Sequence, residues 1–419
     1  MTIKVNPDVL IWARETAGFT LEDAARKLFS DGVRATADEK LEALESGDKE
    51  PSRTQLNSFA KLYKRPLLAF YMEQPPRTGR RGQDFRQSPD SRTKRENAML
   101  DALLRDVKAR QEAVRDILMD DEDFLGRSFV GSVSLKTSVK AVVQSISNEL
   151  RFDYTDVGLR RGDPDKLFKR LREEVEDIGI FVMLLSDLGS HHSTIPSSVF
   201  RGFAIADDVA PFIVINAKEA KPSRSFTLMH ELAHIWLGAT GVSGQASAET
   251  PLNQTAKIER FCNDVAGEFL LPSAHFRKGM PEFDPDDSRG AEAVVDSIAY
   301  KWSVSGPMVA YQLYRTGDLS GGAYASLREM YAARWQAALK KQKEKMKESD
   351  GPNPHVVKSH NLGNALLEVV HRTVRSNALT YTKAANLLGA KPSAVEPLLR
   401  RFEAKRNKGE LFSNPSGVP

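Results

Sequence analysis

The sequence predicts a mainly α-helical protein with one small β-sheet, an α+β fold. Two observations lead to this prediction. Apolar residues recur at three- and four-residue spacing over most of the chain, and Ser, Thr or Asn-Pro often precedes these segments, as in capped amphipathic helices. Short apolar runs typical of strands stand near the middle, in residues 179–185, 198–206 and 211–216. Asp207 and Asp208 separate the last two runs and predict a hairpin.

Composition limits the class of protein. The chain has 419 residues and is 41% hydrophobic, which is enough for several domains with their own cores. It has no apolar run long enough to span a membrane and no apolar signal-peptide segment near Met1. The single cysteine, Cys262, excludes an intramolecular disulfide. We therefore expect a cytoplasmic protein without a membrane partner.

The chain divides into five predicted segments. They are a helical bundle in residues 1–76, a linker and helical middle in 77–164, a core containing the strands in 165–280, a small helical subdomain in 281–330, and a basic helix, helical cap and tail in 331–419. The net charge of +4 results from 60 basic and 56 acidic residues, so it does not by itself indicate a nucleic-acid partner. Any basic surface must be local.

The first segment contains four predicted short helices. Pro7 stands at the first helical position, Gly18 ends that helix, and Thr20 caps the second helix with Asp23 placed to complete a capping box. The third and fourth helices are predicted in residues 40–47 and 51–63.

This order of motifs resembles the helix-turn-helix of Xre/Cro-like repressors. The resemblance rests on Ala24-Ala25, on residues 41–47, on Glu50-Pro51 and on residues 56–63. It implies a module that binds DNA through its third helix or forms a homodimer. That helix is acidic, however, and acidic side chains facing phosphate repel it. DNA binding and simple docking, to a partner or to the rest of the chain, both remain open. The third helix and the residues directly before it carry four acidic side chains, Asp38, Glu39, Glu42 and Glu45, and one basic side chain, Lys40.

A turn-rich basic stretch in residues 74–84 predicts a linker or extended arm. Its arginines could contact phosphate, although a solvated linker is the commoner meaning of such a stretch. Residues 92–118 predict a long helix, which we expect to form a hairpin with the helix of residues 138–150. A third helix, residues 164–178, leads into the core.

The strongest chemical motif is His230-Glu-Leu-Ala-His234. Histidines four residues apart lie on one face of a helix and can provide two ligands to a tetrahedral zinc ion, while Glu231 can act as a general base toward water. Ser223 or Ser225 can cap the helix and Gly238 ends it. The alternative is a buried helix that happens to contain two histidines.

The next predicted helix, in residues 257–272, offers a third ligand. Glu259 can reach the metal if this helix packs back on the first, and Asn263, one turn later, can hydrogen-bond a ligand. The alternative for Glu259 is an ordinary solvated helix acid.

These segments together resemble the ImmA/IrrE family of zinc metallopeptidases. The matching motifs are residues 200–204, 211–216, 226–234, 259–263 and 270–272. The resemblance implies a zincin-like peptidase core with Zn2+ bound by His230, His234 and Glu259, with Glu231 as the general base. Family members cut a repressor of the Xre type, so the resemblance implies a zinc metallo-endopeptidase that cleaves a regulatory, repressor-like protein.

Several other residues are weaker candidates. His191 and His192, in the loop after the first strand, could line the substrate groove or supply an acid, although a loop histidine pair is more often simply exposed. Cys262 could be a thiolate ligand, but a packed core thiol is the simpler interpretation. Arg201 could bind a backbone carbonyl or orient Glu231, and the sequence does not decide between these roles.

The C-terminal third predicts further helices. Residues 291–319 resemble the small helix-turn-helix subdomain that follows the peptidase helices in the same family, where Tyr311 or Tyr314 could approach the site as an oxyanion donor or simply pack in the core. A basic helix follows residue 330. Residues 379–392 again have helix-turn-helix character, with Thr380 as N-cap.

A second functional class also fits the sequence. The chain could be a DNA-binding transcriptional repressor or antitoxin that keeps the zinc fold as a sensor or scaffold. The acidic third helix disfavours this alternative, whereas the motif from His230 to His234 with Glu259 favours the enzyme.

Overall fold

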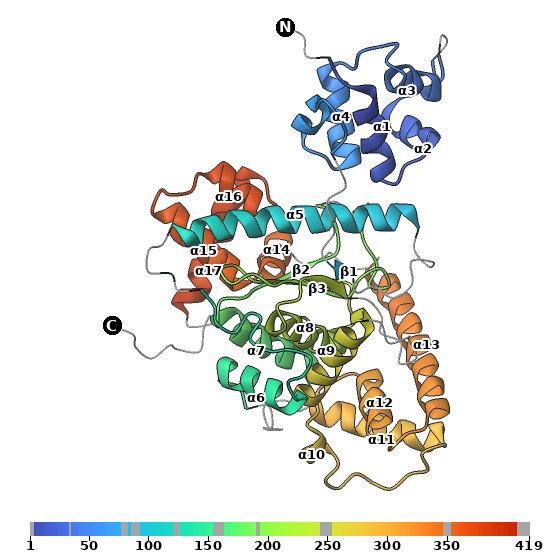
Figure 1. Ribbon diagram of the computed structural model, residues 1–419, viewed down its shortest axis with the longest axis vertical. Helices are drawn as coiled ribbons and strands as arrows, with labels where there is room; N and C mark the ends of the chain where they lie inside the picture. Colours follow the sequence, from blue (N-terminus) through green and yellow to red (C-terminus); the bar gives the residue numbers. More distant parts are fainter. Residues whose placement is uncertain are drawn as a thin grey trace. The chain divides into compact units, whose positions relative to one another are not determined.

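The protein is mostly helical with a small sheet, as the sequence predicts (Figure 1). The computed structural model describes residues 4–32, 35–76, 83–84, 93–120, 124, 126–153, 163–189, 193–243, 254–346 and 353–408. It divides into two compact units. The first comprises Met1–Arg81, Ser88–Lys108 and Asp187–Ile195, and the second comprises Gly82–Gln87, Ala109–Ser186 and Pro196–Pro419.

The first unit is a helical bundle around an aromatic core in which Phe59 stacks on Tyr63. Side-chain caps start its helices, and Thr36 and Ser52 each complete a capping box. Its elements are α1 (Pro7–Thr16), α2 (Leu21–Leu28), α3 (Ala37–Glu45), α4 (Arg53–Tyr63), the 3-10 helix η1 (Leu67–Tyr71) and the first half of α5 (Lys94–Met119).

Helix α3 is less acidic on its outer face than the sequence suggests. Glu45 is buried and accepts two 2.9 Å hydrogen bonds from Nε and Nη2 of Arg14, so the expectation that it faces phosphate is wrong. A buried carboxylate needs such a partner. Residues 29–36 connect α2 to α3, a longer link than the usual helix-turn-helix turn of about three or four residues. DNA binding by this unit stays a prediction.

The second unit is built on a five-stranded sheet of order β1-β5-β3-β4-β2. Strand β4 pairs parallel to β2 and antiparallel to β3, which confirms the predicted hairpin. The three predicted strands are buried apolar runs, whereas β1 and β5 are too short to leave a sequence signal. The strands are β1 (Gln83–Asp84), β2 (Phe181–Leu185), β3 (Gly202–Ile205), β4 (Phe212–Asn216) and β5 (Gly241–Ser243).

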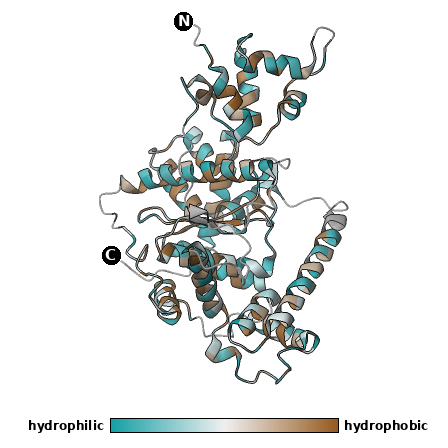
Figure 2. Ribbon diagram, turned by 45° about the vertical axis from the view of Figure 1, so that its right-hand side comes forward, coloured by the Kyte–Doolittle hydropathy of each residue, from teal (hydrophilic) through white to brown (hydrophobic). Residues whose placement is uncertain are grey.

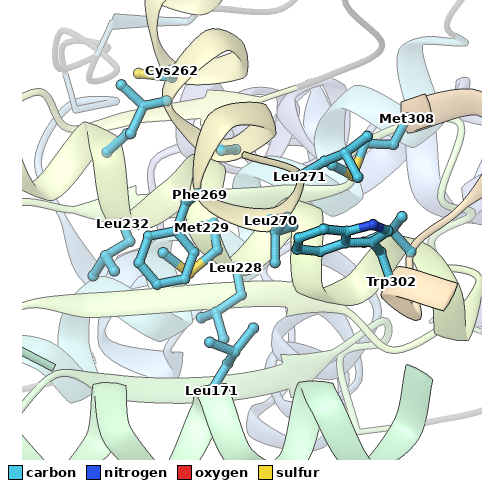
Figure 3. Close-up of a cluster of buried hydrophobic side chains, with 14 of the residues drawn as sticks. Leu171, Leu228, Met229, Leu232, Cys262, Phe269, Leu270, Leu271, Trp302 and Met308 are labelled. Carbon is cyan, nitrogen blue, oxygen red and sulfur yellow. The ribbon is translucent and has the colours of Figure 1, made fainter. Parts of the chain in front are cut away.

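Helices α7 (Pro164–Asp177) and α8 (Lys221–Trp236) pack on the sheet, and α9 (Gln254–Leu270) packs along α8. Their side chains form the main core, in which Leu228 of α8 lies near Leu171 of α7, and Phe269 and Leu270 of α9 belong to the same cluster (Figure 3). Helix α8 is therefore buried for most of its length.

The predicted cap of α8 is wrong, but its predicted end is confirmed. The helix starts at Lys221 after Ala220, without a side-chain cap, and Ser225 lies buried inside it. Proline in the first turn explains the early start, because its fixed φ suits the helix and its missing N–H is not needed there. Gly238 follows the helix with a positive φ of 67°.

The predicted hairpin of α5 with α6 (Val139–Leu150) is also wrong. Helix α6 packs against α9 and α7, while the second half of α5 reaches the β3–β4 turn. There Gln111 Nε2 donates to the Ala210 carbonyl at 3.2 Å, and Arg115 pairs with Asp207 at 2.6 Å. The spacing of apolar residues predicts a buried face but does not identify the element that covers it.

The remaining helices form two groups (Figure 1). After α10 (Ser273–Phe276), the helices α11 (Ser288–Trp302), α12 (Gly306–Arg315) and α13 (Gly321–Met346) pack on one another. The second group, which we call the C-terminal cap, comprises α14 (Pro354–Leu362), α15 (Asn364–Arg375), α16 (Tyr381–Leu388) and α17 (Pro392–Asn407), and α14 and α15 contact β2.

The long helices α5 and α13 carry hydrophilic as well as hydrophobic residues along their length (Figure 2). Within the described part of the chain, no helix combines the length and the apolar character needed to cross a membrane.

A buried ion pair attaches the C-terminal cap to the sheet. Arg172 of α7 pairs with Glu176 at 3.0 Å and donates to the carbonyls of Val182 and His360. Glu176 also accepts from the backbone N–H of Asn364. Burial raises the pKa of Glu176 even though Arg172 opposes this. The carboxylate therefore depends on its partner for compensation.

We predict that Arg172→Met destabilises the protein by about 3–5 kcal/mol, because it leaves the Glu176 charge buried and unpaired. Urea unfolding followed by tryptophan fluorescence measures this change. The matched control is Lys169→Met on the same helix. Lys169 is 71% exposed and pairs with Glu173 at the same spacing, so its loss should cost only about 0–1 kcal/mol. Equal effects of the two changes would contradict the assigned role of the ion pair.

Candidate metal centre

Helices α8 and α9 bring three predicted ligands together. His230 and His234 lie one turn apart on the face of α8 that meets α9, and Glu259 projects from the first half of α9. One ligand atom from each side chain lies within 4.8 Å of the other two. The sequence spacing accounts for the two histidines, and the close packing of α9 on α8 supplies the carboxylate.

The separations of these atoms fit a tetrahedral metal. Ligands at about 2.0–2.1 Å from a zinc ion, at tetrahedral angles, stand about 3.3 Å from one another. The two Nε2 atoms are 3.1 Å apart, His234 Nε2 is 3.1 Å from Glu259 Oε1, and His230 Nε2 is 3.5 Å from Glu259 Oε2. Three such ligands leave a fourth position for water or substrate.

All three ligand candidates are buried, with His230 5%, His234 0% and Glu259 3% exposed. Burial favours the neutral form of Glu259, but the charge of His230 and hydrogen bonds from both histidines outweigh it and lower the pKa of Glu259 to about 2. Burial lowers the pKa of His234. For His230, burial acts in the same direction, but Glu259 more than offsets it and the pKa is raised. The low pKa of Glu259 and the lowered pKa of His234 thus favour the ionised carboxylate and the neutral imidazole, which are the forms that bind metal, whereas a metal ion must displace a proton from His230.

Asn263 supports the site from the next turn of α9. It is 6% exposed, and its side chain hydrogen-bonds His230. A side chain in this position can orient a ligating ring, which is the role predicted for Asn263. Cys262 behaves differently, because burial raises the pKa of its thiol well above the ordinary value and it lies outside the ligand cluster. The core-thiol interpretation of Cys262 therefore fits the structure better than a thiolate ligand.

Glu231 lies fully buried between α8 and strand β3. A Cβ atom on Gly202 of β3 would stand 2.7 Å from Glu231 Oε1 and 2.8 Å from Cγ2 of Thr227. The carboxylate therefore occupies space that only a glycine in the strand leaves open. Gly202 was not among the predicted site residues, although an isolated glycine within a strand is the known signal for such a close approach.

For the remaining candidate residues that the structure describes, the contacts shown are with residues other than the three ligand candidates. Tyr311 donates to Asp264 Oδ1 at 3.2 Å, and Arg315 pairs with the same carboxylate, so this cluster ties α12 to α9. Tyr314 stacks on Tyr324. These contacts fit core packing. His191 and His192, and the arginines of the linker from residue 77 to 86, lie outside the described residues.

Arg201, the residue before Gly202, is partly exposed. Its Nε atom lies 4.0 Å from the buried carboxylate of Glu219. This contact holds the arginine side chain near the start of β3, but it does not show a contact with Glu231.

Residues 175–314 match the model of the peptidase M78 family, described as the IrrE N-terminal-like domain. The matched region includes strands β2 to β5, helices α8 and α9 and the three clustered ligand candidates. It supports the resemblance to the ImmA/IrrE family and a metallopeptidase-type function. Searches of curated proteins and of solved structures gave no match to the chain.

We predict that the purified protein binds one divalent metal ion per chain and that His234→Ala abolishes this binding, because it removes one of three ligands. Asn263→Ala should weaken metal affinity by about 10–100-fold by freeing the His230 ring. Elemental analysis and zinc titration measure both effects. The control His275→Ala changes an exposed histidine and should keep full metal content. Full metal content in His234→Ala would contradict the assigned centre.

Proposed function

We propose that this protein is a zinc-dependent endopeptidase that cleaves a regulatory protein of the repressor type. The observation that carries the proposal is the buried group of His230, His234 and Glu259, with Glu231 on the same helix, inside the region that matches the M78 family model. Zinc is the metal proposed because two imidazoles and one carboxylate are its usual ligands in peptidases of this type.

A zinc ion held by these ligands would polarise the carbonyl of the scissile peptide bond and make water more acidic. Each residue of the chain then has its own task. His230, His234 and Glu259 hold the ion, and Asn263 holds the ring of His230. Glu231 accepts a proton from the attacking water and passes it to the leaving amine.

The setting of Glu231 suits this role. It directly follows the ligand His230, and the α8–β3 contact prevents its side chain from turning away into solvent. A base held in one position needs no reorganisation before the reaction.

The rival proposal is a repressor or antitoxin that uses this fold as a sensor. It requires no proteolysis, so the two proposals differ in one measurable outcome. Specific DNA binding without cleavage of any protein would favour the rival.

We predict that Glu231→Gln keeps the metal but lowers cleavage by about 10²–10⁴-fold, because the amide cannot accept the proton. Labelling of new protein N-termini in cells that express wild type or Glu231→Gln measures this, since it detects cleavage whichever protein is the substrate. The control is Glu282→Gln, which changes an exposed carboxylate. New termini that persist in Glu231→Gln at the wild-type level would exclude the assigned mechanism.

We also predict that Gly202→Ala lowers cleavage by about 10²-fold while metal content stays unchanged, because the added methyl group displaces Glu231 but not the ligands. The matched control is Gly322→Ala, since a Cβ atom there meets nothing within 4 Å. Cleavage of the substrate found by terminal labelling, together with elemental analysis, provides the measurement. Wild-type cleavage in Gly202→Ala would show that the close contact does not position the base.

A further inference from the structure

The basic residues of the chain are unevenly distributed. Residues 353–408 hold ten of the 60 basic residues but only three of the 56 acidic ones, so the C-terminal cap is strongly positive and the rest of the chain is slightly negative. The near-neutral total therefore hides a local basic domain. A basic domain of this size is the electrostatic feature that attracts the phosphate backbone.

The three acids of the cap are already paired. Glu368 lies 3.6 Å from Arg406, and Glu403 pairs with Arg375 at 2.6 Å. Glu396 of α17 is held by Arg400 at 2.7 Å and accepts from the Tyr381 hydroxyl at 2.7 Å. No acid among the described residues of the cap is thus left to oppose a bound phosphate.

Helices α16 and α17 contact each other and have the short connection that is typical of a helix-turn-helix. Residues 389–391 connect them, and Gly389 takes a positive φ of 54° in the turn. Thr380 caps α16, and α15 packs across both helices. Apolar residues on the facing sides are buried, namely Ala384, Ala385, Leu388, Val395, Leu398 and Leu399.

The opposite faces of these helices are open. Lys383 and Asn386 of α16 are exposed, and so are Lys391, Ser393 and Pro397 at the start of α17. The cap attaches to the sheet through α14 and α15, and the side chain of Arg110 from α5 lies against Gly389 of the turn, while the residues named above stay exposed. The N-terminal unit differs from the cap in the length of its helix connection and in its charge. Its α2–α3 connection is longer, and its α3 is acidic.

We propose that α16 and α17 form a DNA-binding helix-turn-helix. The first half of α17 enters the major groove, where Ser393 faces the base edges, and Lys383 and Lys391 contact phosphates on either side. The partner is duplex DNA, a function separate from the proposed peptidase activity.

Binding of the full-length protein to a labelled random-sequence DNA duplex, followed by fluorescence anisotropy at several salt concentrations, tests the proposal. We expect non-specific dissociation constants of about 10⁻⁴–10⁻⁶ M at physiological salt, tighter binding at low salt, and weaker binding to a single strand of the same length. In the double variant Lys383→Glu/Lys391→Glu, the slope of log K against log salt should fall by about 2.

Two charge-matched double variants provide controls. Lys340→Glu/Lys341→Glu changes exposed residues of α13, and Arg26→Glu/Lys27→Glu changes exposed residues of α2. Both should bind the duplex nearly as well as wild type. The proposal is overturned if the full-length protein does not bind duplex DNA, if single strands bind equally well, if the α16–α17 variant binds like wild type, or if either control loses as much. It is also overturned if the α16–α17 change impairs only protein cleavage, since the surface would then recognise a protein.

Discussion

The packing of α9 against α8 is the constraint on which the second unit depends. It places two imidazoles and a carboxylate in the interior, where each would be costly to bury alone. The cost is offset only when the three groups meet one another or a cation at short range, so the helices must hold a fixed distance and register. Apolar side chains of both helices, among them Leu228 and Leu232 of α8 and Phe269 and Leu270 of α9, belong to one buried core that serves this requirement (Figure 3).

The sheet supplies the other side of the same constraint. Strand β3 lies so close to α8 that Gly202 and Glu231 share one space. The strand therefore limits the space of the base, while α9 packs on the face of α8 that carries the two histidines and supplies the third ligand. Since the base and the ligands have different supports, a change in the strand can disturb one without the other, which is why metal content and cleavage are separate readouts of this site.

Much of this could be predicted from the sequence, because local patterns determine it. The motif from His230 to His234 needs only helical spacing, and Gly238 ends the helix by its own conformational freedom. The element that packs against each buried helix face was less predictable from the sequence. The stripe of α5 shows that one side is buried but does not identify the β3–β4 turn as its contact, and the acidic composition of α3 does not reveal that Glu45 turns inward to Arg14. These are long-range contacts, and the residues between them carry no signal of the pairing.

The connection between the cap and the core limits how the two proposed activities can influence each other. The Arg172–Glu176 pair is buried and bonded to β2 and to the backbone of α14 and α15, so moving the cap away would expose or unpair a charge. A ligand shifts a conformational equilibrium only by its preference for one of two accessible states. With no low-cost second arrangement of the cap, DNA bound at α16 and α17 has little means to switch the metal centre. It would instead hold the peptidase near other DNA-bound proteins and raise their effective concentration, which favours cleavage of a repressor on its operator over cleavage of the same protein in solution.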